Sequence, residues 1–134
     1  MTVVSRRQYL GVVTGVAAAV AGCVDRSGEC LEERRDISSV EAGGIISFIF
    51  NLDEQDRLFI DCEHDGFGAR PSVTVIDPNG RTVLSDSRNA HIRRIVTAER
   101  AGEYEIAFEN RARLLSGTWE TRIVAYRGYC EIVP

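Results

Sequence analysis

Hydrophobic and polar residues alternate with a period of two over most of the chain beyond residue 36, which is the pattern of half-buried β-strands. The clearest run is GEYEIAFEN, residues 102–110, in which Tyr104, Ile106 and Phe108 share one face. Glutamates occupy most of the opposite face. A strand of this kind is expected in an antiparallel sheet that packs on a core with one side and meets water with the other.

Similar runs recur roughly every ten residues and are separated by turn-forming sequences. They cover residues 45–52, 58–63, 72–77, 81–85, 92–98, 102–110 and 119–125. The segment DPNG, residues 77–80, has the proline and glycine that a type I or II turn favours. No helical period is present after residue 22. The sequence therefore predicts an all-β protein, an antiparallel β-sandwich or jelly roll of about seven or eight strands.

The first 22 residues follow a different pattern. Arg6 and Arg7 precede an apolar stretch, residues 9–21. This stretch is too short for a membrane-spanning helix, which needs about 20 apolar residues. A basic start, a short apolar segment and a small-residue end are typical of a signal peptide. The paired arginines directly before the apolar stretch indicate the twin-arginine export route. We interpret residues 1–22 as a removable export signal.

The end of this signal predicts a lipid anchor. Val20, Ala21, Gly22 and Cys23 resemble the lipobox of lipoproteins, in which cleavage precedes a cysteine that carries lipid. An unmodified Cys23 behind an ordinary signal is the alternative. With lipid on Cys23, the protein would be held on the outer face of the cell membrane. The polar residues 23–35 would form a tether and residues 36–134 a β-sandwich domain.

Composition narrows the class of partner. The net charge of −4 argues against nucleic acid, and residues 23–134 are too few for a two-lobed solute receptor. All sixteen Lys and Arg residues are arginine, and acidic residues exceed them. This composition resembles that of proteins from salt-loving archaea, although a GC-rich genome would also favour arginine codons.

The cysteine pattern predicts one disulfide. With Cys23 lipidated, Cys30, Cys62 and Cys130 allow three pairings. We favour Cys30 with Cys130, because the ends of a sandwich domain often lie close together and this bridge would close a loop of about 100 residues. None of the cysteine spacings resembles that of a zinc site.

Residues suited to catalysis or redox chemistry are few. Cys62 and His64 would share a face of a continuing strand and form the one local nucleophile–base arrangement. A buried cysteine and a loop histidine are the favoured interpretation. A blue-copper site needs a cysteine, two histidines and usually a methionine, and the only methionine is Met1.

Acidic turns offer oxygen ligands for calcium. Asp53, Glu54 and Asp56 cluster in one turn, and Asp77 and Asn79 in another. Solvated turns on an acidic surface are the favoured interpretation. We therefore expect no metal, no cofactor and no enzymatic activity.

The best candidate for binding is the loop CEHDGFGARP. Phe67 is flanked by glycines and has no strand to bury it, and an exposed aromatic residue on a loop is a common contact residue. His64, Asp65 and Arg70 would contribute beside it. The alternative is that Phe67 folds back and plugs the end of the sandwich.

The segments VIDPNG, AGEYEIAFEN and GTWETRIVAY resemble the GOLD (Golgi dynamics) domain, a β-sandwich family best known from secretory cargo receptors. The match covers most of residues 29–126 and includes Asp77, Pro78, Gly80, Gly102, Tyr104, Phe108 and Asn110. Family members often have a disulfide from an early cysteine, matched by Cys30, to a position that is Ala107 here. The resemblance implies a β-sandwich module for protein or ligand interaction without chemistry of its own. A trafficking role is not carried over, because this sequence departs from the cargo receptors at Ala107 and shows no long coiled-coil stalk.

Together these patterns predict an exported, lipid-anchored, extracellular β-sandwich that binds a protein, a glycan or the cell envelope without catalysis. A metal-binding or electron-transfer sandwich is the alternative.

We expect the mature protein to begin at Cys23 and to carry the mass of a lipid on that residue. Intact-protein mass spectrometry on material from native membranes measures both properties. A mature chain that begins elsewhere, or Cys23 without lipid mass, would contradict the anchor.

Overall fold

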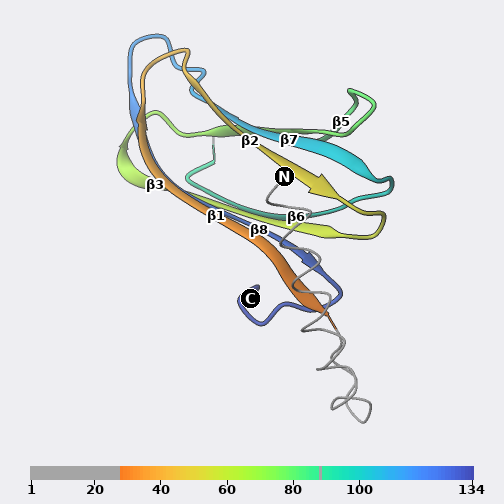
Figure 1. Cartoon of the computed structure of the whole chain (residues 1–134). Helices are drawn as coiled ribbons and strands as arrows, with labels where there is room; N and C mark the ends of the chain where they lie inside the picture. Colours follow the sequence, from red (N-terminus) through yellow and green to blue (C-terminus); the bar gives the residue numbers. More distant parts are fainter. Residues whose placement is uncertain (1–27, 88) are drawn as a thin grey trace.

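A computed structural model describes residues 28–87 and 89–134, which form eight strands in two antiparallel sheets (Figure 1). The predicted all-β sandwich is thus confirmed. The strands are β1 Glu29–Val40, β2 Ile45–Leu52, β3 Arg57–Gly68, β4 Ser72–Ile76, β5 Thr82–Asp86, β6 His91–Thr97, β7 Gly102–Glu109 and β8 Gly117–Arg127.

The segments on which the export and anchoring predictions depend lie outside the described residues. These are the predicted signal at residues 1–22 with Arg6 and Arg7, and the predicted lipid site Cys23. Within residues 28–87 and 89–134, no helix is long and apolar enough to cross a bilayer.

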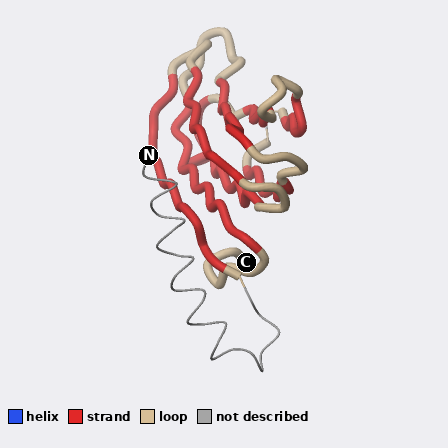
Figure 2. Tube along the Cα trace, turned by 45° about the vertical axis from the view of Figure 1, so that its right-hand side comes forward, coloured by secondary structure: helices blue, strands red, loops and turns tan. Residues whose placement is uncertain are grey.

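Consecutive strands run in opposite directions. The first sheet has the order β1-β8-β3-β6 and the second has the order β2-β7-β4-β5, with every neighbouring pair antiparallel. The connections therefore fall at two ends of the molecule (Figure 2). We call the end with the start of β1 and the end of β8 the base. The opposite end, the tip, holds the connections 41–44, 69–71 and 110–116 and the described residues 87, 89 and 90 between β5 and β6.

The core lies between the inner faces of the two sheets. Alternate residues of each strand supply it, as the period of two predicts. The largest fully buried side chains are Trp119, Tyr104, Phe50, Phe108, Leu58, Ile60, Ile92, Ile106 and Ile123. Phe48 meets the ring of Phe108 edge to face, with the ring centroids 6.1 Å apart. On β7 the three glutamates occupy the outer face, so this strand has the predicted orientation.

Two segments differ from the sequence-based expectation. Residues 29–35, expected within a tether, belong to β1 and pair with β8, so the folded domain begins before residue 36. The charged residues of this segment do not alternate with apolar ones, so the pattern did not predict a strand. An edge strand such as β1 accepts charged side chains, and here they form ion pairs, for example Glu33 with Arg122 at 2.7 Å. The expected loop after Cys62 is also shorter, because β3 continues through an irregularity to Gly68.

The C-terminal residues cover part of the outer face of the first sheet. Cys130 packs in a second small cluster with Phe59, Val124 and Tyr126. A disulfide joins Cys130 to Cys30, with 5.1 Å between their Cα atoms, which confirms the favoured pairing. This bridge ties the end of the chain to the start of β1 at the base.

The disulfide should contribute measurably to stability, because it closes a loop with a sequence separation of 100. We expect the double variant Cys30→Ala, Cys130→Ala to lower the free energy of unfolding by about 2–5 kcal/mol in urea titrations. Reductant should destabilise the wild-type protein by a similar amount and leave the double variant unchanged. A wild-type transition that is insensitive to reductant would contradict this contribution.

Candidate functional site

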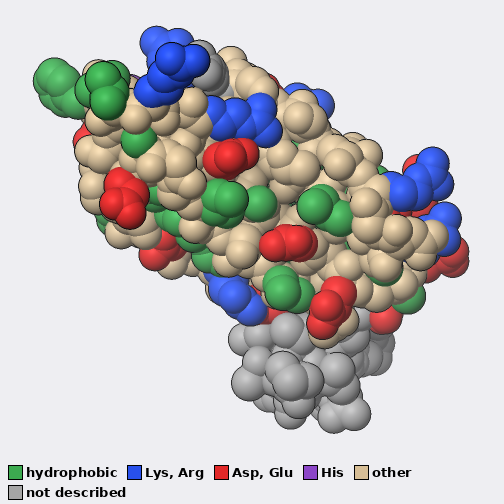
Figure 3. Space-filling view, turned by 90° about the horizontal axis from the view of Figure 1, so that it is seen from above, with side chains coloured by type: hydrophobic (Ala, Val, Ile, Leu, Met, Phe, Trp, Pro, Cys, Tyr) green, Lys and Arg blue, Asp and Glu red, His purple; other side chains and the backbone are tan. Residues whose placement is uncertain are grey.

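The two most exposed large apolar side chains of the described residues, Leu114 and Phe67, lie at the tip together with Leu115. Leu114 is 92% exposed, Phe67 82% and Leu115 60%, and we call these three residues the tip patch. Their segments are neighbours, because Gly68 pairs with Gly117 and the Ala69 N–H donates to the Ser116 carbonyl oxygen at 3.0 Å. Figure 3 shows hydrophobic side chains that stand out from one end of the molecule beside basic side chains.

Phe67 is pushed outward by a tight bulge in β3. Between His64 and Gly68 the strand loses its regular pairing with β8. Gly66 and Gly68 have φ angles of +102° and +79°, which favour glycine, and a Cβ on Gly68 would lie 2.1 Å from the Ser116 carbonyl oxygen. Phe67 therefore points into solvent, and the alternative that it plugs the sandwich is wrong.

His64 and Asp65, both predicted to bind a ligand, hold this bulge together. The Gly66 N–H donates to His64 Nδ1 at 3.2 Å, so Nε2 carries the proton and donates to the Gly68 carbonyl oxygen at 3.0 Å. The Phe67 N–H donates to Asp65 Oδ1 at 3.0 Å. The two side chains thus position Phe67. Arg70, the fourth predicted residue, is exposed beside a hollow of about 340 Å³.

The β7–β8 connection is held by Asn110, which is fully buried. Its side-chain amide donates to the carbonyl oxygens of Val40 at 2.9 Å and Leu115 at 2.8 Å. Its Oδ1 accepts from the Ala112 N–H at 2.9 Å. Asn110 therefore stabilises the turn that follows it, and it positions the loop that carries Leu114.

Sequence reasoning missed Leu114 and Leu115. The signal was present in the segment RARLLSG, where two leucines stand outside any alternating run and are flanked by polar and basic residues. Arg113 beside them is exposed, while Arg111 pairs with Glu109 at 3.0 Å. The surroundings of the tip patch are therefore partly basic.

Cys62 and His64 do not form a nucleophile–base pair. Cys62 is fully buried on the inner face of β3, where its Sγ lies 3.6 Å from Thr121 Oγ1. Burial raises the pKa of the Cys62 thiol to about 11. Since both ring nitrogens of His64 bond within the bulge, the histidine is not placed to accept the thiol proton. The buried cysteine is thus a core residue, as the favoured interpretation held.

The acidic turn at 53–56 surrounds an arginine. Arg127 Nε lies 2.8 Å from the buried Asp56, and its other nitrogens lie 2.8 Å from Asp53 and 3.3 Å from Glu29. In the second turn, Asp77 Oδ1 accepts backbone N–H groups of its own turn. Across residues 28–87 and 89–134, no group of three or more His, Cys, Asp or Glu side chains is arranged to hold a metal ion.

Comparisons with known proteins show similarity of fold. No protein-family model matches the chain, and no curated protein matches it. The Aeromonas hydrophila PliG, a periplasmic lysozyme inhibitor of g-type lysozyme, superposes with a TM-score of 0.53 at 11% identity, over 69% of this chain and 85% of that one. The PliG of Salmonella Typhimurium gives 0.50 at 8% identity, over 69% and 86%.

A domain of a bacterial collagenase has a comparable fold. The pre-peptidase C-terminal domain of collagenase from Bacillus anthracis superposes with a TM-score of 0.53 at 15% identity. The match covers 68% of this chain and 88% of that domain. These superpositions show a shared fold, and at identities of 8–15% they show nothing about function.

The raised pKa of Cys62 predicts a loss of stability at alkaline pH. The unfolded chain releases this thiol proton above pH 9, whereas the folded chain holds it until about pH 11. The resulting stabilisation, about 2–3 kcal/mol, is complete below pH 9 and is lost as pH rises to about 11. The wild-type protein should therefore lose more stability over this range than Cys62→Ala in urea titrations. Parallel pH profiles would contradict the shift.

Proposed function

We propose that this chain is an exported, lipid-anchored and non-catalytic module that binds another protein through its tip patch. The observation that carries the proposal is the exposure of Phe67, Leu114 and Leu115 on neighbouring segments. Large apolar side chains clustered on rigid loops are typical of protein contacts, because their burial excludes water from both surfaces. Two of the three are aliphatic, which favours a protein partner over a glycan.

The direction of the strands supports a role at the cell surface. The expected lipid site, Cys23, precedes the start of β1 by a few residues, so the anchor would lie next to the base. β1 contains 12 residues and runs from the base to the tip, a distance of roughly 35–40 Å at 3.3 Å per residue. The tip patch would therefore be presented away from the membrane.

Other features agree with export and with binding. The Cys30–Cys130 disulfide suits an oxidising compartment outside the cytoplasm. Two of the structures with a similar fold are described as periplasmic inhibitors of a lysozyme. The GOLD resemblance likewise implies an interaction module. The buried, protonated Cys62 and the bonded ring of His64 support a module without catalysis.

Substitution of the tip patch should remove binding without affecting the fold. We expect Leu114→Ser and Phe67→Ser in the anchored full chain to reduce partner capture from native membranes at least about tenfold. The free energy of unfolding should change by less than about 0.5 kcal/mol, because these side chains are exposed. The measurements are photo-cross-linking from position 115 and urea denaturation.

Ile37→Ser provides the matched control, because Ile37 is 72% exposed on β1 and belongs to no tip connection. Its capture of the partner should equal that of the wild-type protein. Equal losses for Ile37→Ser and Leu114→Ser would indicate nonspecific adhesion, and unchanged capture by the tip variants would contradict the proposal.

A further inference from the structure

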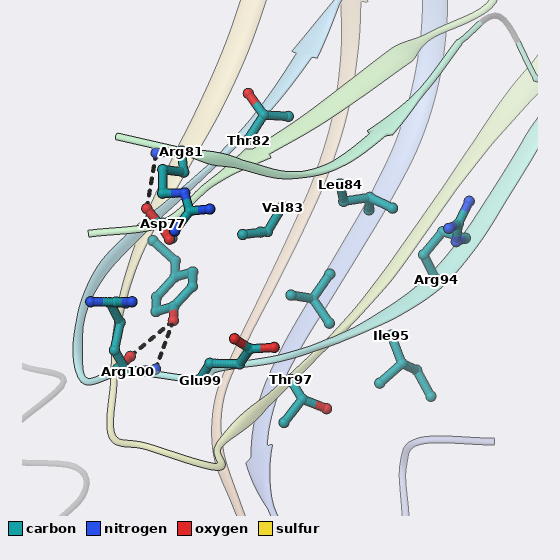
Figure 4. Close-up of a pocket in the computed structure, with 12 residues that line it drawn as sticks. Asp77, Arg81, Thr82, Val83, Leu84, Arg94, Ile95, Thr97, Glu99 and Arg100 are labelled. Carbon is teal, nitrogen blue, oxygen red and sulfur yellow. Dashed lines mark hydrogen bonds between the residues drawn. The ribbon is translucent and has the colours of Figure 1, made fainter. Parts of the chain in front are cut away.

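A groove of about 450 Å³ runs between the edge strands β5 and β6, on one side of the sandwich (Figure 4). Its floor is apolar and includes the buried side chains of Leu84, Val96 and Tyr104. Its rim carries three arginines, namely Arg81 before β5, Arg94 on β6 and Arg100 after β6. Two carboxylates, those of Asp77 and Glu99, also line it, and Asp77 Oδ1 accepts backbone N–H groups of its own turn. The groove is separate from the tip patch, and its floor is formed by side chains at the edge of the core.

The opposite side of the sandwich, between β1 and β2, is covered. Arg34 on β1 lies over the ring of Phe50, 5.3 Å from its centroid. The same guanidinium bonds Glu32 at 2.7 Å and donates to the Ile49 carbonyl oxygen of β2 at 3.4 Å. One arginine thus bridges these two edges, whereas a groove separates β5 from β6.

The backbone of β6 presents a free edge beside this groove. The Ala98 N–H donates to the Asp56 carbonyl oxygen, and the backbone N–H of His64 donates to the Ala90 carbonyl oxygen, both at 2.8 Å. In the alternating antiparallel pattern, the backbone N–H and C=O groups of the even-numbered residues of this segment therefore point toward β3. The N–H and C=O groups of His91, Arg93, Ile95 and Thr97 face away from the sheet, and no described strand pairs with them.

Basic side chains flank this edge on both faces. Arg94 lines the groove and pairs with Asp86 at 3.0 Å, while Arg93 lies on the outer face, 3.9 Å from Asp61. Among residues 28–87 and 89–134, no carboxylate lies within ion-pair distance of the Arg81 or Arg100 guanidinium. These two arginines are therefore available to a carboxylate from outside.

We propose that an extended, acidic segment of a partner polypeptide adds to the free edge of β6 and extends the four-stranded first sheet. Backbone groups of the segment bond to the odd-numbered residues of β6. Alternate side chains of the segment enter the groove, where carboxylates on aliphatic stems meet Arg81 and Arg100 above the apolar floor. This surface is separate from the tip patch and does not depend on it.

A second copy of the chain is a poorer occupant. Antiparallel pairing of β6 with itself would bring Arg93 and Arg94 close to the same arginines of the other copy, and like charges on paired strands are unfavourable. The arginines thus oppose self-association and favour an acidic strand.

The test uses the full mature protein and two synthetic peptides, one of alternating glutamate and valine and one of alternating lysine and valine. Amide hydrogen exchange is followed residue by residue. With the glutamate peptide, exchange should slow at least tenfold at His91, Arg93, Ile95 and Thr97. Exchange at Ile92, Arg94 and Val96 should change little, since their amides already face β3. The lysine peptide should protect none of them.

Variants separate the contributions of backbone and charge. Ile95→Pro removes one free-edge donor that bonds to no described residue and should abolish protection. Arg81→Glu and Arg100→Glu should each weaken binding at least about tenfold, and they decide the outcome if Ile95→Pro fails to fold. Arg113→Glu and Leu114→Ser at the tip are the matched controls and should bind like the wild-type protein.

Three results would overturn the inference. The first is a glutamate peptide that leaves the odd-numbered amides unprotected, and the second is a lysine peptide that binds as well as the glutamate peptide. In the third, sodium glucuronate would displace the glutamate peptide at equal concentration and itself bind without amide protection. That outcome would assign the groove to small anions or acidic sugars.

Discussion

Packing of the inner faces of the two sheets is the interaction on which the other features of this protein depend. Trp119 on β8 and Tyr104 and Phe108 on β7 are fully or almost fully buried between the sheets. Since neighbouring residues of a strand point to opposite faces, a slip of one residue would move the whole apolar set into water. The register of every strand is therefore constrained. Changes of sequence that leave the core intact are possible mainly at the tip, the base and the free edges of the sheets.

The same core side chains also hold the loops. Trp119 Nε1 donates to the Ala69 carbonyl oxygen at 2.9 Å, next to the bulge that carries Phe67. Asn110 joins the β1–β2 turn to the loop that carries Leu114 and Leu115. The tip patch is thus preorganised, so its apolar side chains can bind with little loss of conformational entropy.

The base is closed by a covalent bond and by ion pairs. The Cys30–Cys130 disulfide joins the two ends of the domain, and Arg127 gathers Asp53, Asp56 and Glu29 around one guanidinium. Arginine suits this position because its planar group bonds several carboxylate oxygens at once. Exposed pairs elsewhere, such as Arg35 with Glu33, contribute little to stability. The base is therefore cross-linked by a disulfide and by ion pairs, whereas the side chains of the tip patch and the edge of β6 are exposed.

How far the sequence predicts this structure depends on whether the relevant signal is local. Alternation along residues 102–110 and 119–125 determined the strands, their buried faces and the sandwich class, because the side-chain period of a strand is written directly in its residues. The exposure of Phe67 followed from its flanking glycines as one of two alternatives. The Cys30–Cys130 pairing was favoured among three, because the ends of a sandwich tend to meet.

Other properties were decided only by the tertiary structure. The sequence pattern did not predict a strand over residues 29–35, because the residues that pair with their charged side chains, such as Arg122, are distant in sequence. The role of His64 and Asp65 in supporting Phe67 depends on a bulge set by pairing with β8. Phe67 and Leu114 come close together because the strands next to them end side by side. The groove between β5 and β6 likewise depends on how separate strands are placed. Such neighbours are chosen by the pairing order of the sheets, which no local period in the sequence specifies.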